Sequence, residues 1–213
     1  MSSNHTIAQQ NDPGELLEVF DARGRGTGVA KSRAAIHIDG DWHQAFHCWI
    51  VRFGTQVVLQ RRSLQKDTFA GFWDASAAGH WRFGETAEQA SREVFEELGL
   101  SMPFSAFRYG GRERMARTFE NGLIDREHHQ VYVLQHDASL LTYSPDPKEV
   151  AALAALHIAD LMELLADRRR TARAPEAVAV GGDGKLSAVQ LDVPANELVP
   201  YSVARMRRIL GPP

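Results

Sequence analysis

The sequence lacks the features that several large classes of protein require. Cys48 is the only cysteine among 213 residues, so no disulfide can form within the chain. No apolar run approaches the roughly 20 residues that a membrane-spanning helix needs. The first residues are polar and contain no apolar core of a secretory signal. These absences predict a soluble cytoplasmic protein without a membrane partner.

Neither sign of charge dominates the chain. There are 24 Lys and Arg against 27 Asp and Glu, which gives a formal net charge of -3. A general nucleic-acid binder would need a broad basic surface, so we expect no nucleic-acid partner. Hydrophobic residues form 44% of the chain, enough for one domain with a sizeable core. We predict a flexible tail at 1–14 and a single domain over 15–213, with a C-terminal extension from about residue 174.

Alternating and β-branched runs predict more strand than helix. Residues 148–156 fit either a strand or a helix, whereas the acidic stretch in mid-chain has clear helical periodicity. Several strands around one acidic helix and peripheral helices predict an α/β sandwich built on a mixed sheet. Strands are expected within 15–33, 45–62, 71–85, 128–137 and 176–191, and further short helices within 159–170 and 201–210.

The acidic stretch "SREVFEELGL" belongs to a helix that we expect to begin near Thr86. Thr86 and Gln89 fit the capping-box pattern, and Gly99 supplies a C-terminal stop. The helix should bury one apolar stripe opposite its acidic side. That stripe consists of Ala90, Val94 and Leu98.

Three carboxylates share one face of this helix. Glu93, Glu96 and Glu97 occupy positions i, i+3 and i+4, where like charges disfavour a helix by roughly 0.2–0.5 kcal/mol per pair. A bound divalent cation would compensate for this repulsion. The plainer interpretation is a solvated acidic face, because glutamate is a good helix former.

The surroundings of the triplet resemble the Nudix box. Gly79 is followed by five residues and Glu85, and the run from Arg92 to Leu100 matches the second half of that box in full. Six residues separate Glu85 from Arg92, one fewer than in the family. A one-residue deletion in a helix rotates the preceding residues by about 100°. Glu85 is therefore left out of the predicted site.

The resemblance implies a Nudix α/β/α sandwich with a mixed sheet and a central acidic helix. It also implies a hydrolase that cleaves a diphosphate linkage in a small molecule, a nucleoside diphosphate or another organic diphosphate. Carboxylate oxygens suit Mg²⁺ or Mn²⁺. The implied metal ligands are Glu93, Glu96, Glu97 and the Gly79 carbonyl, and the implied catalytic residues are Glu96, Glu97, Arg92 and Glu127, with Arg92 orienting a glutamate. A homodimer is a further expectation from the family.

The resemblance extends over about residues 17–165, to the Nudix branch that includes type I isopentenyl-diphosphate isomerase. The isomerase binds a metal through histidines and glutamates, which implies a second metal site here. The alternative is that these histidines are ordinary hydrogen-bonded residues of strands. The residues concerned are His37, His43, His80, Asp125 and Glu127.

The chemistry of residue 78 separates hydrolysis from isomerisation. Where the isomerase has a cysteine, this chain has Ala78, whose methyl group can neither donate nor accept a proton. Cys48 is expected on a different strand and is not a substitute. We therefore favour a hydrolase, with an isomerase and a non-catalytic diphosphate sensor as alternatives.

Basic residues precede the expected catalytic loop. Arg61, Arg62 and Lys66 could bind the phosphates of a substrate. Each could equally belong to a solvated strand end.

Overall fold

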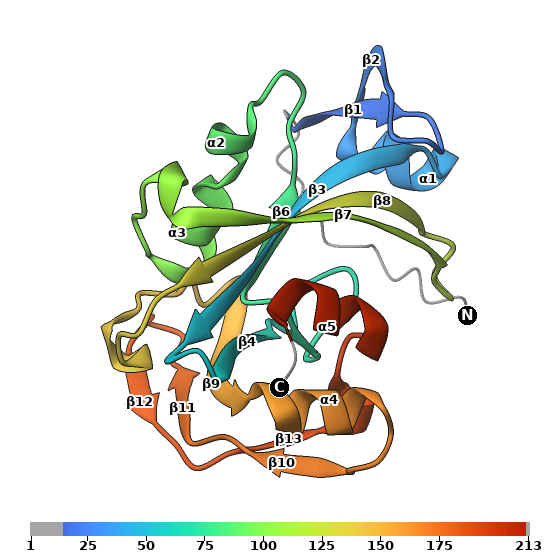
Figure 1. Ribbon diagram of the computed structural model, residues 1–213. Helices are drawn as coiled ribbons and strands as arrows, with labels where there is room; N and C mark the ends of the chain where they lie inside the picture. Colours follow the sequence, from blue (N-terminus) through green and yellow to red (C-terminus); the bar gives the residue numbers. More distant parts are fainter. Residues whose placement is uncertain (1–14, 212–213) are drawn as a thin grey trace, which may run out of the picture.

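The computed structural model describes residues 15–211, so the predicted tail at 1–14 lies outside the described residues. An 11-stranded mixed sheet organises the chain (Figure 1). A separate two-stranded sheet pairs β10 (Thr171–Arg173) with β13 (Asp192–Pro194). The large sheet consists of β1 (Leu16–Phe20), β2 (Gly26–Ser32), β3 (Trp42–Arg52), β4 (Gln56–Arg62), β5 (Trp73–Asp74), β6 (Ala77–His80), β7 (Phe107–Thr118), β8 (Ile124–Gln135), β9 (Val150–His157), β11 (Glu176–Val180) and β12 (Leu186–Ala188).

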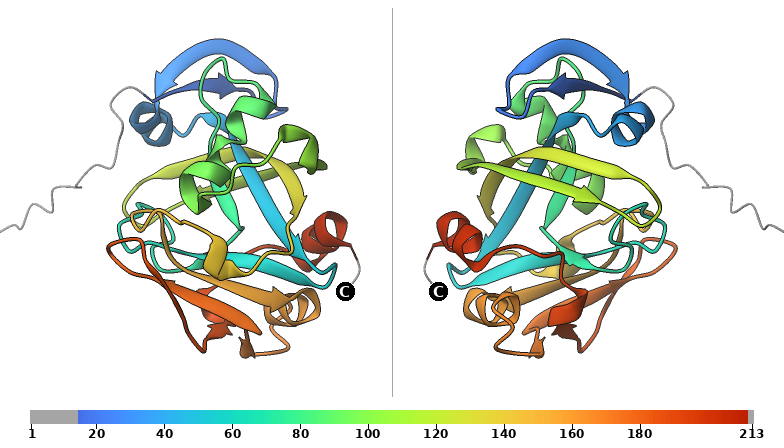
Figure 2. Two further views of the ribbon diagram at one scale, coloured as in Figure 1. Left: turned by 90° about the vertical axis from the view of Figure 1, so that its left-hand side faces the viewer. Right: turned by 90° about the vertical axis from the view of Figure 1, so that its right-hand side faces the viewer.

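Helices cover both faces of the sheet, and each face has its own apolar core. One core holds α2 (Ala87–Ala90) and α3 (Arg92–Leu98), and the other holds α4 (Ile158–Leu165) and α5 (Val203–Leu210). A fifth helix, α1 (Arg33–Asp39), lies beside β1 and β2 at the end opposite β10 and β13 (Figure 2). The predicted α/β sandwich with a mixed sheet is confirmed.

The central strand β3 has different partners along its length. It pairs in parallel with β8, and antiparallel with β6 in its first half and with β4 at its end. Ser76 bridges the point where β4 and β6 separate, because its hydroxyl donates to the Val58 carbonyl and accepts from the Ile50 N–H. This branching brings residues of β6 and β8 to the two sides of β3.

The acidic helix is interrupted, which differs from the continuous helix that we predicted. The Thr86–Gln89 capping box is present, but α2 ends at Ala90 and α3 begins only at Arg92. Ser91 joins them, and its carbonyl accepts from the N–H of Val94 three residues on. The expected apolar stripe is buried on both sides of this break. The shorter spacing between Glu85 and Arg92 thus spans the junction between two short helices.

Helix α1 and strand β9 lie in segments whose structure the sequence pattern did not predict or left open, whereas β11 lies where we expected a strand. Residues 33–39 form α1, which the apolar pattern did not predict, and residues 148–156, left open, contribute strand β9. Beyond residue 174, β11 continues the sheet by pairing with β9. We keep one domain over 15–213 as a proposal, since this extension shares the main sheet. Within residues 15–211, no helix is long and apolar enough to cross a bilayer.

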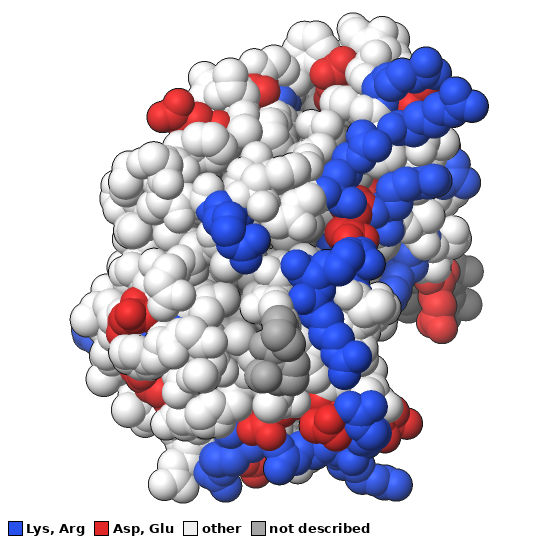
Figure 3. All heavy atoms as spheres, in the orientation of Figure 1, with Lys and Arg blue, Asp and Glu red and all other residues white. Residues whose placement is uncertain are grey.

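Basic side chains protect an open edge of the sheet. Within the described part of the chain, strand β7 pairs only with β8, and it exposes Arg108, Arg112 and Arg114. Lys and Arg gather along the right-hand side of the face shown in Figure 3. Charged side chains on an edge strand discourage pairing with a strand of another molecule.

Candidate active site

A cavity of about 570 Å³ lies among β3, β6, β8, α3, α5 and the loop that follows β4. Carboxylates outnumber Lys and Arg among the side chains that line it. A cavity with such a lining attracts cations and, through them, anionic ligands.

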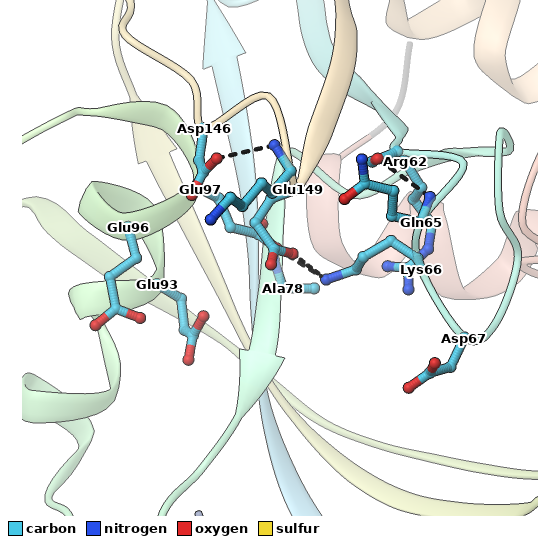
Figure 4. A network of polar contacts seen from close by, with 12 residues as sticks. Arg62, Gln65, Lys66, Asp67, Ala78, Glu93, Glu96, Glu97, Asp146 and Glu149 are labelled. Carbon is cyan, nitrogen blue, oxygen red and sulfur yellow. Dashed lines mark hydrogen bonds and ion pairs between the residues drawn. The ribbon is translucent and has the colours of Figure 1, made fainter. Parts of the chain in front are cut away.

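The three helix carboxylates contribute differently to the cavity. Glu93 and Glu97 are buried, whereas the Glu96 side chain is 45% exposed. The carboxylates of Glu93 and Glu96 point towards the same open space (Figure 4). Helix α3 therefore delivers all three predicted glutamates to the lining of one cavity.

Arg92 connects the glutamates to one another. Its Nη1 lies 2.5 Å from Glu93 Oε1 and 2.7 Å from Glu96 Oε2, and its Nε lies 2.8 Å from Glu85 Oε1. Its Nη2 also donates to the His80 carbonyl at 3.3 Å. Glu85 thus contacts Arg92 despite the short spacing of the motif, but it does not line the cavity.

Glu97 is held by donors on neighbouring strands. Its Oε2 accepts from Gln60 Nε2 and from the Ala78 N–H, each at 2.9 Å. Lys66 Nζ lies 3.9 Å from the other oxygen and forms an ion pair with Glu149 (Figure 4). These two hydrogen bonds orient the Glu97 carboxylate.

Gly79 allows Glu93 to approach β6 closely. An ideal Cβ at Gly79 would lie 2.1 Å from both Cδ and Oε2 of Glu93. Any larger residue would force that carboxylate to move. The glycine of the motif is therefore required here for space as well as for its predicted carbonyl ligand.

Burial raises the pKa of Glu93 to about 8, against a partial opposing effect of Arg92, and burial also raises the pKa of Glu97. An unfolded chain ionises Glu93 near 4.5. Between these values the folded protein binds the extra proton, so the free energy of unfolding falls as the pH rises.

This shift predicts a pH-dependent stability of the metal-free protein. In EDTA, the wild type should lose stability between about pH 6 and about pH 8 relative to Glu93→Gln, which has no carboxyl to ionise there. Thermal melts of both proteins across this range measure the effect. A melting-temperature difference that stays constant over the range would contradict it.

The second predicted cluster assembles beside the cavity: His37, His80, Asp125 and Glu127 line it, and the fully buried His43 adjoins them. His37 comes from α1, His43 from β3 and His80 from β6, and ligand nitrogens of all three lie within 4.8 Å of one another. Asp125 Oδ1 is 3.7 Å from Nε2 of both His37 and His43. Glu127 Oε1 is 3.7 Å from His43 Nε2 and 3.8 Å from His80 Nε2.

Buried atoms without hydrogen-bond partners fit a cation in this cluster. His43 Nε2 and Asp125 Oδ1 are both buried and have no such partner among residues 15–211. The Asp41 carbonyl lies 3.2 Å from His43 Nδ1, which places a proton on Nδ1 and directs Nε2 towards the cluster. Burial, together with the neighbouring His43, lowers the pKa of His80 well below its usual range. Neutral imidazoles and carboxylates are suitable ligands for a divalent transition metal.

Two of the three predicted phosphate-binding residues line the cavity. Arg62 and Lys66 line the cavity. Arg61 does not line it, because neighbouring strand residues point to opposite faces, and its guanidinium pairs with Glu197 at 3.0 Å. We therefore no longer include Arg61 among the substrate contacts.

Several residues that the sequence reasoning missed also line the cavity, and three of them are buried and carry titratable or basic groups close to Glu127 or to one another. His47, His129 and Arg205 are buried there. His47 follows His43 by four positions on a strand, so the two-residue alternation could have placed both on one face. No local pattern could have found Arg205, which comes from α5.

Comparisons with known proteins agree with this architecture. Residues 41–177 match the family described as the NUDIX domain. An uncharacterised Nudix hydrolase of Clostridium acetobutylicum is 32% identical over 200 residues, which cover 92% of this chain and 95% of the relative.

The chain is also similar to an isopentenyl-diphosphate isomerase and to a solved structure. An isopentenyl-diphosphate Delta-isomerase of Burkholderia multivorans is 32% identical over 157 residues, 72% of this chain and 84% of that protein. The crystal structure of protein DR0079 from Deinococcus radiodurans superposes with a TM-score of 0.56 at 23% identity, over 72% of this chain and 90% of that one. The match to the family and the full-length similarity show that this protein belongs to the Nudix hydrolase family.

Proposed function

We propose that this protein hydrolyses the diphosphate linkage of a nucleoside diphosphate or another organic diphosphate, using Mg²⁺ or Mn²⁺ held by Glu93, Glu96, Glu97 and the Gly79 carbonyl. The observation that carries the proposal is the convergence of three helix carboxylates on one cavity, with Arg92 joining two of them. Such a cluster of hard oxygen ligands suits these ions.

Individual residues of the cavity have separate roles in the proposed hydrolysis. A bound cation would neutralise charge on the diphosphate and on the leaving group. Arg62 and Lys66 bind phosphate oxygens, and Arg92 holds Glu93 and Glu96 in place. Glu96, the most exposed carboxylate of the three, takes the proton of the attacking water, while one bridging P–O bond breaks and the new P–O bond forms. Glu97 stays fixed by its two donors.

We also propose that the histidine cluster holds a second divalent cation. His37, His43 and His80 supply nitrogens, and Asp125 and Glu127 supply oxygens. The buried, unpartnered His43 Nε2 supports this assignment. Glu127 thereby acts from outside the Nudix motif, in the lining of the same cavity.

Isomerisation of isopentenyl diphosphate is the second candidate, because relatives with that name cover most of this chain. It requires an acid where Ala78 stands. Cys48 does not line the cavity and is fully buried in the core beneath α3, where burial raises its pKa. These facts favour hydrolysis. A non-catalytic diphosphate sensor is the third possibility, and it would have no need of all three glutamates.

A substrate panel tests the proposal. Purified protein with Mg²⁺ or Mn²⁺ is incubated with nucleoside and isoprenoid diphosphates, and the products are separated by ion-exchange chromatography and identified by ³¹P NMR. We expect phosphate or a monophosphate product that disappears in EDTA. Conversion of isopentenyl diphosphate into its isomer without phosphate release would refute the hydrolase. Binding without turnover, unchanged by Glu96→Gln, would favour the sensor. Homodimer formation and cytoplasmic location stay predictions.

A further inference from the structure

Helix α5 inserts an arginine into the cavity from outside the segment that matches the family. The match covers residues 41–177, whereas Arg205 lies 76 residues beyond His129 in the chain. The Arg205 side chain is buried, and its Nη2 lies 2.7 Å from His129 Nδ1. Met206 and Ile209 of the same helix are fully packed in the core, which fixes the position of α5.

The other ring nitrogen of His129 contacts Glu127. Its Nε2 lies 2.6 Å from Glu127 Oε2. A guanidinium has only donors, so Nδ1 of His129 must accept and the ring proton must be on Nε2. That proton is then donated to the carboxylate. The neighbour Arg205 therefore selects the one tautomer of His129 that can bind Glu127.

The two oxygens of Glu127 consequently have different partners. Oε2 is occupied by His129, whereas Oε1 faces His43 and His80 at 3.7 and 3.8 Å. The His129 ring also stacks on His47, with centroids 3.8 Å apart and an angle of 15° between the planes. This stacking restricts rotation of the imidazole that holds Glu127.

We propose that Arg205 and His129 are positioning residues that hold Glu127 Oε1 towards the histidine cluster, ready to bind a divalent cation. This inference rests on the proposed second metal site. Without the Arg205 donor, His129 can carry its proton on Nδ1. Its Nε2 lone pair would then face Glu127 Oε2, and repulsion between two acceptors would turn the carboxylate away. Loss of such outer partners weakens metal binding by about 10–100-fold.

Cobalt titration tests the role of Arg205 without measuring activity. Binding of Co²⁺ is followed by its visible absorbance, and the part of the signal lost in His43→Ala reports the histidine site. We expect Arg205→Met to weaken that binding by about 10–100-fold. The matched control is Arg207→Met, which alters an exposed residue of the same helix and should bind Co²⁺ like the wild type. Arg205→Lys retains a donor and should recover part of the affinity.

A double-mutant cycle distinguishes the chain of hydrogen bonds from Arg205 through His129 to Glu127, here called the relay, from a packing role of these side chains. His129→Phe keeps an aromatic ring against His47 but removes both nitrogens, and it should cause a similar loss of affinity. Adding Arg205→Met to His129→Phe should cause no further loss, because the relay is already broken. Additive losses, or unchanged Co²⁺ affinity in Arg205→Met, would overturn the relay while leaving the metal site intact. Absence of any His43-dependent signal in the wild type would overturn both proposals.

Discussion

The substitution Glu96→Gln should lower kcat/KM for the best substrate of the panel by about 10²–10⁴-fold. The Glu96 carboxylate is a proposed ligand of a cation that would lower the activation free energy by several kcal/mol. Each 1.4 kcal/mol of that contribution corresponds to a factor of about ten in rate. Glutamine keeps the size of the side chain. Because Glu96 is 45% exposed, the substitution should change the stability of the fold little.

The control for this experiment is Glu88→Gln, a change of the same kind on α2. Glu88 is exposed and lies outside the cavity lining, so its loss should leave kcat/KM close to that of the wild type. Melting temperatures of both variants should remain near the wild-type value. Equal activity of Glu96→Gln and wild type would exclude Glu96 from the chemistry.

The second large effect is expected from Gly79→Ala. The added Cβ would lie 2.1 Å from Glu93 Oε2, and the end of that flexible side chain is what must move. The backbone of Gly79 has no positive φ, so alanine itself introduces no backbone strain. A displacement of about 1 Å in such a site can reduce the rate about 10²-fold. Activity should therefore fall much more than stability.

Gly182→Ala is the matched control, because a Cβ added there would have no heavy atom of residues 15–211 within 4 Å and the φ of Gly182 is not positive. Steady-state kinetics and thermal melts of the two variants should differ in kcat/KM but little in melting temperature. If Gly79→Ala melted far below the wild type while retaining its rate, the close approach of Glu93 would matter for folding alone.

The local sequence pattern predicted which carboxylates share one face of the acidic helix, but it did not predict where the helix is interrupted. The 3.6-residue period placed Glu93, Glu96 and Glu97 together, and the capping box predicted at Thr86 is present. The break at Ser91 was missed, because the residues on both sides of it have helical propensity.

The histidine cluster was predicted only through resemblance, for a different physical reason. His43 and Glu127 meet because β3 and β8 pair in parallel, in a register that sets these two residues opposite each other. His37 reaches them from α1, a helix whose residues 33–39 gave no clear apolar period. Strand register over such separations is set by the whole core, which no local pattern encodes.

The sequence by itself determined the family, the acidic helix face and the identity of its carboxylates, since these follow from residues only a few positions apart. The tertiary structure alone decided that Glu85 rejoins Arg92, that Arg61 points away from the cavity, and that α5 brings Arg205 to His129. Contacts between distant segments arise when apolar faces pack together, and packing depends on the sum of many weak interactions rather than on any short motif.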